Sequence, residues 1–186
     1  MVRTRRVTDT ALHVAVAGAR GVDVRDVDAT LDEVRELVGD AAFQLFDAEM
    51  VAGWRHLYHA AVNAALAIQY GSAISKSVDV ETILYASCQD QISKAFTLMG
   101  LSPQVKNVGV LVISENPSEA KRLATQIAEH LGSPDDEVLD VTSGKFEKLK
   151  DVFEVGDEAL ATVGSDPYEA LTSLVVEKGA LLPLRR

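Results

Sequence analysis

Residues 106–130, KNVGVLVISENPSEAKRLATQIAEH, carry the clearest strand signal and the clearest helix start in the chain. Residues 106–113 form a nearly continuous apolar run, which is typical of a strand buried on both faces. Asn116 is suited to cap a helix, Pro117 suits the first helical position, and a carboxylate follows in the first turn. The segment therefore predicts a buried strand followed by a helix that runs to His130.

The same kinds of signal extend the prediction to both ends of the chain. Strands are predicted over residues 11–17, 42–46 and 137–141, and helices near residues 30–38, 47–70, 78–87, 89–99, 145–153 and 167–179. Thr30 and Glu33 have the spacing of a capping box, in which each side chain bonds the backbone N–H of the other residue. Together these elements predict an α/β (α+β) fold, with one domain over residues 1–186 and a small mixed β-sheet packed against several α-helices.

The composition suits a globular protein with an acidic surface. Hydrophobic residues make up 47% of the 186 residues, and 18 Lys and Arg stand against 28 Asp and Glu, for a formal net charge of -10. The acids are scattered along the chain, which fits a halophilic, high-salt cytoplasm, although an ordinary acidic protein would have the same composition. The net charge argues against non-specific binding of nucleic acid, so any RNA contact has to be local.

Three further features of the sequence indicate where the protein resides. No apolar run reaches the roughly 18 residues that span a bilayer. The basic start MVRTRR is followed by VTDT rather than by the apolar region of a secretory signal. The single cysteine, Cys88, cannot form a disulfide within the chain. These observations predict a cytoplasmic protein with no membrane contact.

Motifs for catalysis and cofactor binding are missing. The chain has no G-x-G-x-x-G, no P-loop and no G-x-S-x-G, so no cofactor is predicted. His56 and His59 have the spacing for two metal ligands on one helix face, but the sequence favours a half-exposed stripe with Trp54 and Tyr58. Cys88 lies in an apolar helical stretch, where a thiol usually serves as a small core residue. A small thiol- or metal-dependent enzyme remains the alternative to a protein without an active site.

The loop Ser75-Lys76-Ser77 has a different character. A basic side chain between two hydroxyls, directly before a helix, offers donors and backbone N–H groups to a phosphate or a sugar. The other interpretation is structural, with Ser77 capping the helix and Lys76 solvated. Spacing alone favours the structural interpretation.

A longer stretch around this loop resembles a known family. ISKSVDVETILYAS (74–87), followed by QISKAF (91–96), is similar to the signature I-S-K-S-x-x-x-E-I-L-L-Y-x-S…R-Q-I-x-x-A-[IF]. This is the signature of the TPRKB-like family, archaeal type, which is the small kinase-binding regulatory subunit of the KEOPS (EKC) complex. The resemblance extends to the apolar strand 108–113 and to the A-L-L sequence at 180–182.

The resemblance implies a non-catalytic role in the threonylcarbamoyl-adenosine modification of tRNA. The partners it implies are a Bud-type atypical kinase/ATPase, the TsaD-like transferase indirectly, and the single-stranded 3′ CCA end of tRNA. The positions that match the signature, and to which tRNA binding is carried over, are Ile74, Lys76, Ser77, Ser87, Gln91 and Ile92. Unstacked bases can enter an apolar groove while a few donors hold the backbone, so no broadly basic surface is needed.

Two features qualify these expectations. The family signature has Arg before Gln-Ile where this chain has Asp90, an acid that would repel phosphate, so a kinase-docking adaptor without RNA binding is a further alternative. For kinase docking, the last helix offers a stripe at helical spacing, formed by Leu171, Leu174, Val175 and Lys178. The stripe suits an interface and the protein's own core equally well.

Overall fold

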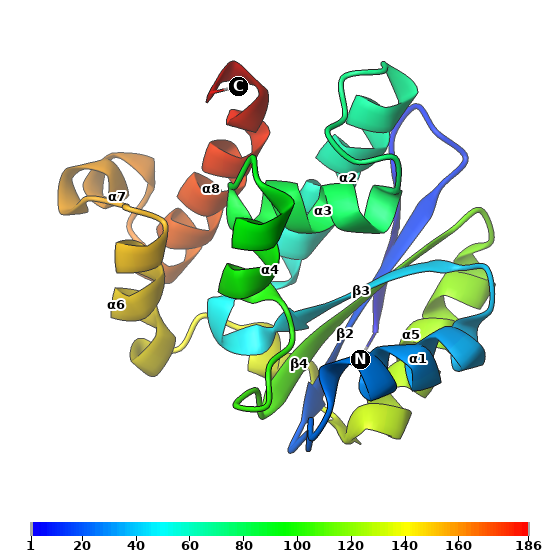
Figure 1. The fold of residues 1–186 in the computed structure, drawn as a ribbon. Helices are drawn as coiled ribbons and strands as arrows, with labels where there is room; N and C mark the ends of the chain where they lie inside the picture. Colours follow the sequence, from blue (N-terminus) through cyan, green and yellow to red (C-terminus); the bar gives the residue numbers. More distant parts are fainter. Residues whose placement is uncertain (1, 186) are drawn as a thin grey trace.

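The computed structural model describes residues 2–185, and an antiparallel sheet lies at its centre (Figure 1). The strands are β1 (Arg3–Arg6), β2 (His13–Arg20), β3 (Ala42–Asp47), β4 (Asn107–Ser114) and β5 (Ser133–Pro134). They are ordered β1-β2-β4-β3, and β5 pairs with the far end of β2. The α+β class is confirmed, but the predicted mixed sheet is wrong, because β4 lies between β2 and β3 and runs antiparallel to both.

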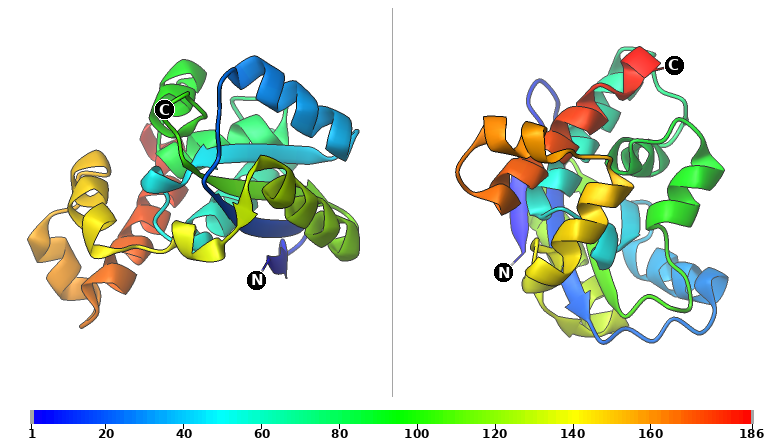
Figure 2. Two further views of the ribbon diagram at one scale, coloured as in Figure 1. Left: turned by 90° about the horizontal axis from the view of Figure 1, so that it is seen from below. Right: turned by 90° about the vertical axis from the view of Figure 1, so that its left-hand side faces the viewer.

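Helices cover both faces of this sheet. They are α1 (Val27–Val38), α2 (Trp54–Gln69), α3 (Val78–Ser87), α4 (Ile92–Met99), α5 (Pro117–Leu131), α6 (Ser143–Val152), α7 (Asp157–Val163) and α8 (Pro167–Ala180), with 3-10 turns η1 (Ala48–Met50), η2 (Asp136–Leu139) and η3 (Leu182–Arg185). Helices α1 and α5 bury residues in one core cluster, and α2, α3, α4 and α8 bury residues in the other. Figure 2 shows α6, α7 and α8 gathered on one side of the molecule.

The central strands are buried on both faces, as the apolar run 106–113 predicts. Along β2, Ala15 and Ala17 belong to the cluster with α1 and α5, whereas Val14 and Val16 belong to the opposite cluster. A strand with apolar side chains on both sides needs a covering layer on each face of its sheet, and here both layers are helical. The two layers therefore follow from the composition of β2 and β4.

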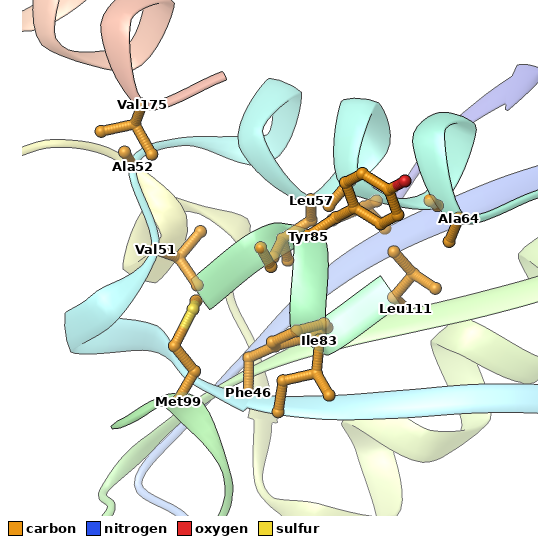
Figure 3. Packing of buried hydrophobic residues seen from close by; sticks show 14 of the residues in the cluster. Phe46, Val51, Ala52, Leu57, Ala64, Ile83, Tyr85, Met99, Leu111 and Val175 are labelled. Carbon is orange, nitrogen blue, oxygen red and sulfur yellow. The ribbon is translucent and has the colours of Figure 1, made fainter. Parts of the chain in front are cut away.

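The larger core cluster is built around α2 and α3. Phe46 from β3, Ile83 from α3 and Leu111 from β4 are all buried in this cluster, and Figure 3 labels them among its members. The buried face of α2 consists largely of alanine, such as Ala61 and Ala64, so α3 can approach its backbone closely. As a result α3 is buried along almost its whole length.

Several predicted boundaries are wrong for local reasons. The helix predicted over residues 47–70 begins only at Trp54. Gly53 has a positive φ of 83°, and this conformation separates the helix from the turn η1. Residues 137–141 contain the turn η2 instead of a strand, and it lies so close to β2 that a Cβ on Gly18 would collide with the carbonyl oxygen of Asp135. Both features depend on contacts between distant segments, which the sequence pattern does not contain.

The first helix also starts earlier than predicted. Asp26 caps α1 by accepting a hydrogen bond from the N–H of Ala29, and Thr30 lies inside the helix, where its hydroxyl donates to the Asp26 carbonyl. The Thr30–Glu33 capping box is therefore wrong. The strand β1 and the helix α7 were not predicted, since both are short.

Residues near both ends of the chain share the larger core cluster. Val7 and Leu182 are both buried in it. A shared core fits one domain, although the extent of that domain over residues 1–186 stays a prediction because residues 1 and 186 lie outside the described part. None of the helices within residues 2–185 combines the length and the apolar character that a bilayer-spanning segment needs.

Candidate functional site

The loop between α2 and α3 is held in place by a buried carboxylate. Glu81, which is fully buried in the first turns of α3, accepts a hydrogen bond of 2.7 Å from the backbone N–H of Ser75. The Ser75 hydroxyl in turn accepts a bond of 3.1 Å from the N–H of Ser77. Lys76 is exposed between these two anchored residues. The loop therefore presents Lys76 from a fixed backbone.

The capping interpretation of this loop is only partly right. Ser77 occupies the N-cap position of α3, with φ -118° and ψ 131°. Among the described residues of α3, however, none donates a backbone capping bond to the Ser77 hydroxyl. Glu81 takes over the ordering of the loop from within the helix, and it was singled out in the sequence only as part of the family signature. Glu81 orders the loop from a fully buried position.

The signature positions divide into two groups at opposite ends of α3. Ile74 and Lys76 precede the helix, whereas Gln91 and Ile92 follow it at the start of α4. A helix of this length spans about 15 Å, at 1.5 Å per residue. All four side chains are exposed, with 40% of Ile74 and 42% of Ile92 accessible to solvent. The arrangement suits an extended ligand better than a single base in one pocket.

The surface beside Ile92 is hollowed. A depression of about 370 Å³ lies along α4, lined by Gln89, Ser93, Lys94, Thr97 and Leu98. Leu98 is its apolar residue and Lys94 its cation, and Gln89, Ser93 and Thr97 add polar side chains. Phe96, on the same helix, is 37% exposed. Such a surface can hold an unstacked base and grip the backbone attached to it.

Two of the carried-over positions, Ser87 and Ser77, are not exposed. Ser87 is only 1% exposed, and its hydroxyl donates to the carbonyl of Leu84 at 3.2 Å. Ser77 is half-buried. A direct contact between RNA and Ser87 therefore does not fit this structure, because the hydroxyl lies beneath the surface and is engaged within α3. Asp90 is exposed beside Gln91, so its negative charge is part of the surface.

The histidine pair on α2 is not arranged as a metal site. His56 is buried, its Nδ1 accepts from the N–H of Ala52 at 3.1 Å, and its Nε2–H donates to the carbonyl of Ala86 at 2.8 Å. Burial lowers the pKa of His56 from 6.5 to about 4, so the ring is neutral. Both nitrogens join backbone segments, and His56 is a structural link that the sequence did not reveal. Across residues 2–185, no group of three or more potential metal ligands comes together.

Cys88 is also poorly suited to catalysis. It caps the C-terminus of α3 with a left-handed φ of 55° and is half-buried. Burial raises the pKa of its thiol from 9.0 to about 11, and the positive charges of Lys178 and Arg185 offset this only in part. At neutral pH the sulfur is therefore protonated, whereas the nucleophile in thiol chemistry is the thiolate.

The predicted kinase-binding stripe on α8 faces largely inward. Leu171 and Val175 are fully buried in the larger core cluster, and Leu174 is half-buried against it. Lys178 donates to the Phe153 carbonyl at 2.5 Å and bonds Glu154 at 2.9 Å, which ties α8 to the end of α6. Of the two interpretations of this stripe, packing in the protein's own core fits Leu171 and Val175.

The exposed apolar residues of this region lie further along the chain. Leu181 is 40% exposed and Leu184, in η3, is 81% exposed. A hollow of about 260 Å³ next to them is lined by Leu174 and Leu181 on one side and by Val155 and Ala159 on the other. Helical spacing alone could not find this surface, because its residues come from α8, η3, α7 and the connection between α6 and α7.

Comparison with known proteins gives one positive result. No curated protein matches the chain. The family model described as kinase binding protein CGI-121 matches residues 23–182. The matched range contains the whole segment 74–96 from which the family was predicted, together with α8. The chain belongs to the CGI-121 family of kinase-binding proteins, which is the family of the small KEOPS subunit predicted from its sequence.

Proposed function

We propose that this protein is a non-catalytic subunit of a cytoplasmic KEOPS complex that binds its Bud-type kinase/ATPase and recruits the 3′ CCA end of tRNA for threonylcarbamoyl-adenosine modification. It acts on the TsaD-like transferase indirectly, through the kinase. The observation that carries the proposal is the match of a kinase-binding family over residues 23–182. Two exposed surfaces support the proposal, one for each proposed partner.

For tRNA, the supporting feature is the exposed surface at the two ends of α3. Ile74 and Ile92 supply apolar area for unstacked bases, and Lys76 and Gln91 supply donors for the backbone. The two groups lie at opposite ends of α3, which is about 15 Å long, so a short extended strand can contact both. Ser87 supports this surface from below, and the half-buried Ser77 positions the loop at its edge.

For the kinase, the supporting feature is the exposed apolar area at the end of the chain. Leu181 and Leu184 flank the hollow beside Leu174, and charged residues such as Glu177 and Lys178 border it. An apolar centre within a polar rim is the usual anatomy of a protein interface. We therefore place the kinase contact on these residues, with Leu171 and Val175 holding α8 in position beneath it.

The chemistry of the buried groups supports a role without catalysis. The Cys88 thiol has a pKa of about 11, and His56 is neutral with both ring nitrogens engaged. A thiol- or metal-dependent enzyme would need one of these groups to be reactive.

A kinase-docking adaptor that does not bind RNA is the second candidate, and one observation favours it. A hollow of about 710 Å³ on the other side of Ser77 is lined by the acids Asp32, Glu36, Asp40 and Asp79, with Arg35 as its cation. These carboxylates limit the approach of phosphates to Lys76 from that side, and Asp90 adds a negative charge at the opposite end of α3. An RNA strand would have to reach Lys76 from the side of Ile74.

The two candidates are separated by one reconstitution. The purified protein is mixed with the Bud-type kinase and separately with tRNA, and complex formation is measured by size exclusion and by filter binding. We expect a stable complex with the kinase, and tRNA affinity that falls when the 3′ CCA end is removed. Kinase binding without any tRNA affinity would establish the adaptor, and absence of kinase binding would overturn the proposal.

A further inference from the structure

The N-terminal strand carries a cluster of arginines that the proposed function does not use. Arg3 and Arg5 project from the same face of β1, since side chains alternate along a strand. Their guanidinium carbons lie 5.3 Å and 5.9 Å from the centre of the Trp54 ring, at the start of α2. Both arginines precede residue 23, where the match to the family model begins. They form a local cationic surface on a chain whose net charge is -10.

The guanidinium groups of Arg3 and Arg5 are held in place but remain available. Contact with the face of an aromatic ring restrains a guanidinium group while its N–H donors stay free for another partner. Within residues 2–185, neither Arg3 nor Arg5 takes part in an ion pair. The neighbouring Arg55 differs, because Glu169 binds it at 2.5 Å.

The strand beneath the arginines is itself fixed. The Tyr58 hydroxyl donates to the carbonyl of Arg6 at 2.9 Å, and the Arg6 guanidinium bonds the carbonyl of Thr10. These contacts tie β1 to α2 and to the following turn. A hollow of about 290 Å³ lies next to Arg3, lined by Trp54, Arg55, Tyr168 and the acidic Asp140 among others. The surface is thus preformed. Asp140 and Glu169 both line this hollow, and Asp135, Asp136 and Glu137 line a second hollow of about 540 Å³ that also borders Arg3.

The positive charge of Arg3 and Arg5 suits a polyanionic partner. The geometry of β1 indicates whether that partner is an acidic peptide or a nucleic acid. An acidic peptide could pair with β1 as an added strand, but β1 spans only Arg3–Arg6 and the carbonyl of Arg6 is already occupied by Tyr58. Charged side chains along a short edge strand also hinder pairing with another strand. Recognition is left to the arginine side chains, whose planar donor groups match phosphate oxygens in a bidentate manner.

We infer that Arg3 and Arg5, backed by Trp54, form a contact site for the phosphate backbone of a nucleic acid, distinct from the surface at the ends of α3. The inference rests on the proposed function only in naming tRNA as that nucleic acid. Trp54 begins α2 and the Lys76 loop follows its end, so the two sites are separated by about 24 Å along the helix axis. The arginine site contacts the body of the tRNA, while the α3 surface takes its 3′ end.

The test uses the full protein and tRNA whose 3′ CCA end has been removed. Trp54 is the single tryptophan of the chain, so its fluorescence reports binding at the arginine site directly. We expect the clipped tRNA to bind, with a fluorescence change. The double variant Arg3→Ala/Arg5→Ala should weaken this binding roughly tenfold or more. It should also reduce the slope of log K against log salt by about two, one for each lost phosphate contact.

Controls separate the loss of contacts from a loss of charge or of folding. Arg25→Ala removes an arginine that is 87% exposed and bonded to Asp23, and it should leave both affinity and salt slope unchanged. Arg3→Lys/Arg5→Lys keeps the charge and should restore part of the affinity, since only the bidentate geometry is lost. Thermal unfolding of every variant verifies that β1 remains folded.

The outcomes distinguish this inference from the proposed function. If clipped tRNA does not bind while intact tRNA does, the arginine site is wrong and recruitment of the CCA end stands. If clipped and intact tRNA bind equally and both depend on Arg3 and Arg5, the arginine site stands and CCA recruitment fails. Displacement of the RNA by an equally charged polyglutamate peptide at the same concentration would overturn the choice of a nucleic acid.

Discussion

Glu81 and Ser75 are joined by a hydrogen bond of 2.7 Å between a buried carboxylate in α3 and the backbone N–H of the preceding loop. The carboxylate is taken out of water inside the helix layer, which is costly unless it is well bonded. Its bond to Ser75 fixes the loop that carries Lys76. The buried acid Glu81 thereby determines the position of the exposed Lys76.

Replacing the Glu81 side chain should act mainly by destabilising the loop that carries Lys76, and less by changing the charge of the protein. Glu81→Ala leaves the Ser75 N–H without its acceptor, and we expect the free energy of unfolding to fall by about 1.5–3 kcal/mol. Glu81→Gln retains an acceptor oxygen and should cost less. Urea unfolding measures both, and amide hydrogen exchange over residues 72–77 should accelerate. Asp79→Asn, in the same turn of α3, is the matched control and should have little effect. An equal loss of stability in that control would contradict the role of Glu81.

Lys76 should matter for RNA and not for stability. Its side chain is exposed, so Lys76→Ala is expected to change the free energy of unfolding by less than about 0.5 kcal/mol. The loss of a charged donor to a phosphate should weaken binding of intact tRNA about tenfold, while kinase binding stays unchanged. Filter binding and size exclusion provide the two measurements. Lys106→Ala, which removes another exposed lysine just before β4, should bind tRNA normally. If Lys76→Ala abolished kinase binding but left the affinity for tRNA intact, the assignment of the kinase surface and the tRNA surface would be wrong.

Leucines of the C-terminal region should divide into a structural group and a docking group. Leu171 is fully buried, so Leu171→Ala should destabilise the fold by about 2–5 kcal/mol. Leu184 is 81% exposed, so Leu184→Asp should leave stability nearly unchanged but weaken kinase binding at least about tenfold. Leu37→Asp, on α1 in the opposite helix layer, is the control for an added surface charge. Kinase affinity unaltered by Leu184→Asp would remove η3 from the proposed interface.

The sequence predicted those parts of the fold whose signals are local. The apolar run of β4 and the cap of α5 by Asn116 and Pro117 lie within one short segment, and both predictions are confirmed. The start of α2 could not be predicted, since helix periodicity continues through Gly53 and only the positive φ at that residue reveals the break. The antiparallel pairing of β2 with β4 joins residues that are distant in the chain, and no periodicity within a strand contains it.

The candidate site shows the same division. Its exposed residues were found because they match a contiguous signature, but the division of that signature between the two ends of α3 is a property of the fold. Helical spacing grouped Leu171 with Lys178, and it could not tell that this face of α8 packs on α2 and α3. The arginines near Trp54 lie outside the signature, and about fifty residues of chain separate them from their aromatic partner. Contacts over such distances appear only in three dimensions.

His56 should make the protein sensitive to mild acid. The pKa of this buried ring is about 4 in the folded protein and 6.5 when it is free, so between these values the unfolded chain binds a proton that the folded protein does not. The free energy of unfolding should therefore fall as the pH is lowered from about 6.5 toward 4, at up to about 1.4 kcal/mol per pH unit from this group. Above pH 6.5 the ring is neutral in both states, and its contribution no longer changes.

His56→Gln isolates this effect, because an amide can accept from the Ala52 N–H and donate to the Ala86 carbonyl without titrating. We expect the variant to be less stable at pH 7.5, since the fit of the ring is lost, but to show a shallower decline in stability between pH 6.5 and 4.5. Urea unfolding at several pH values gives both slopes, and their difference cancels the carboxylates that titrate in the same range. Parallel slopes for the wild type and His56→Gln would mean that the ring is protonated in the folded protein, and the bond from Ala52 to its Nδ1 could then not exist.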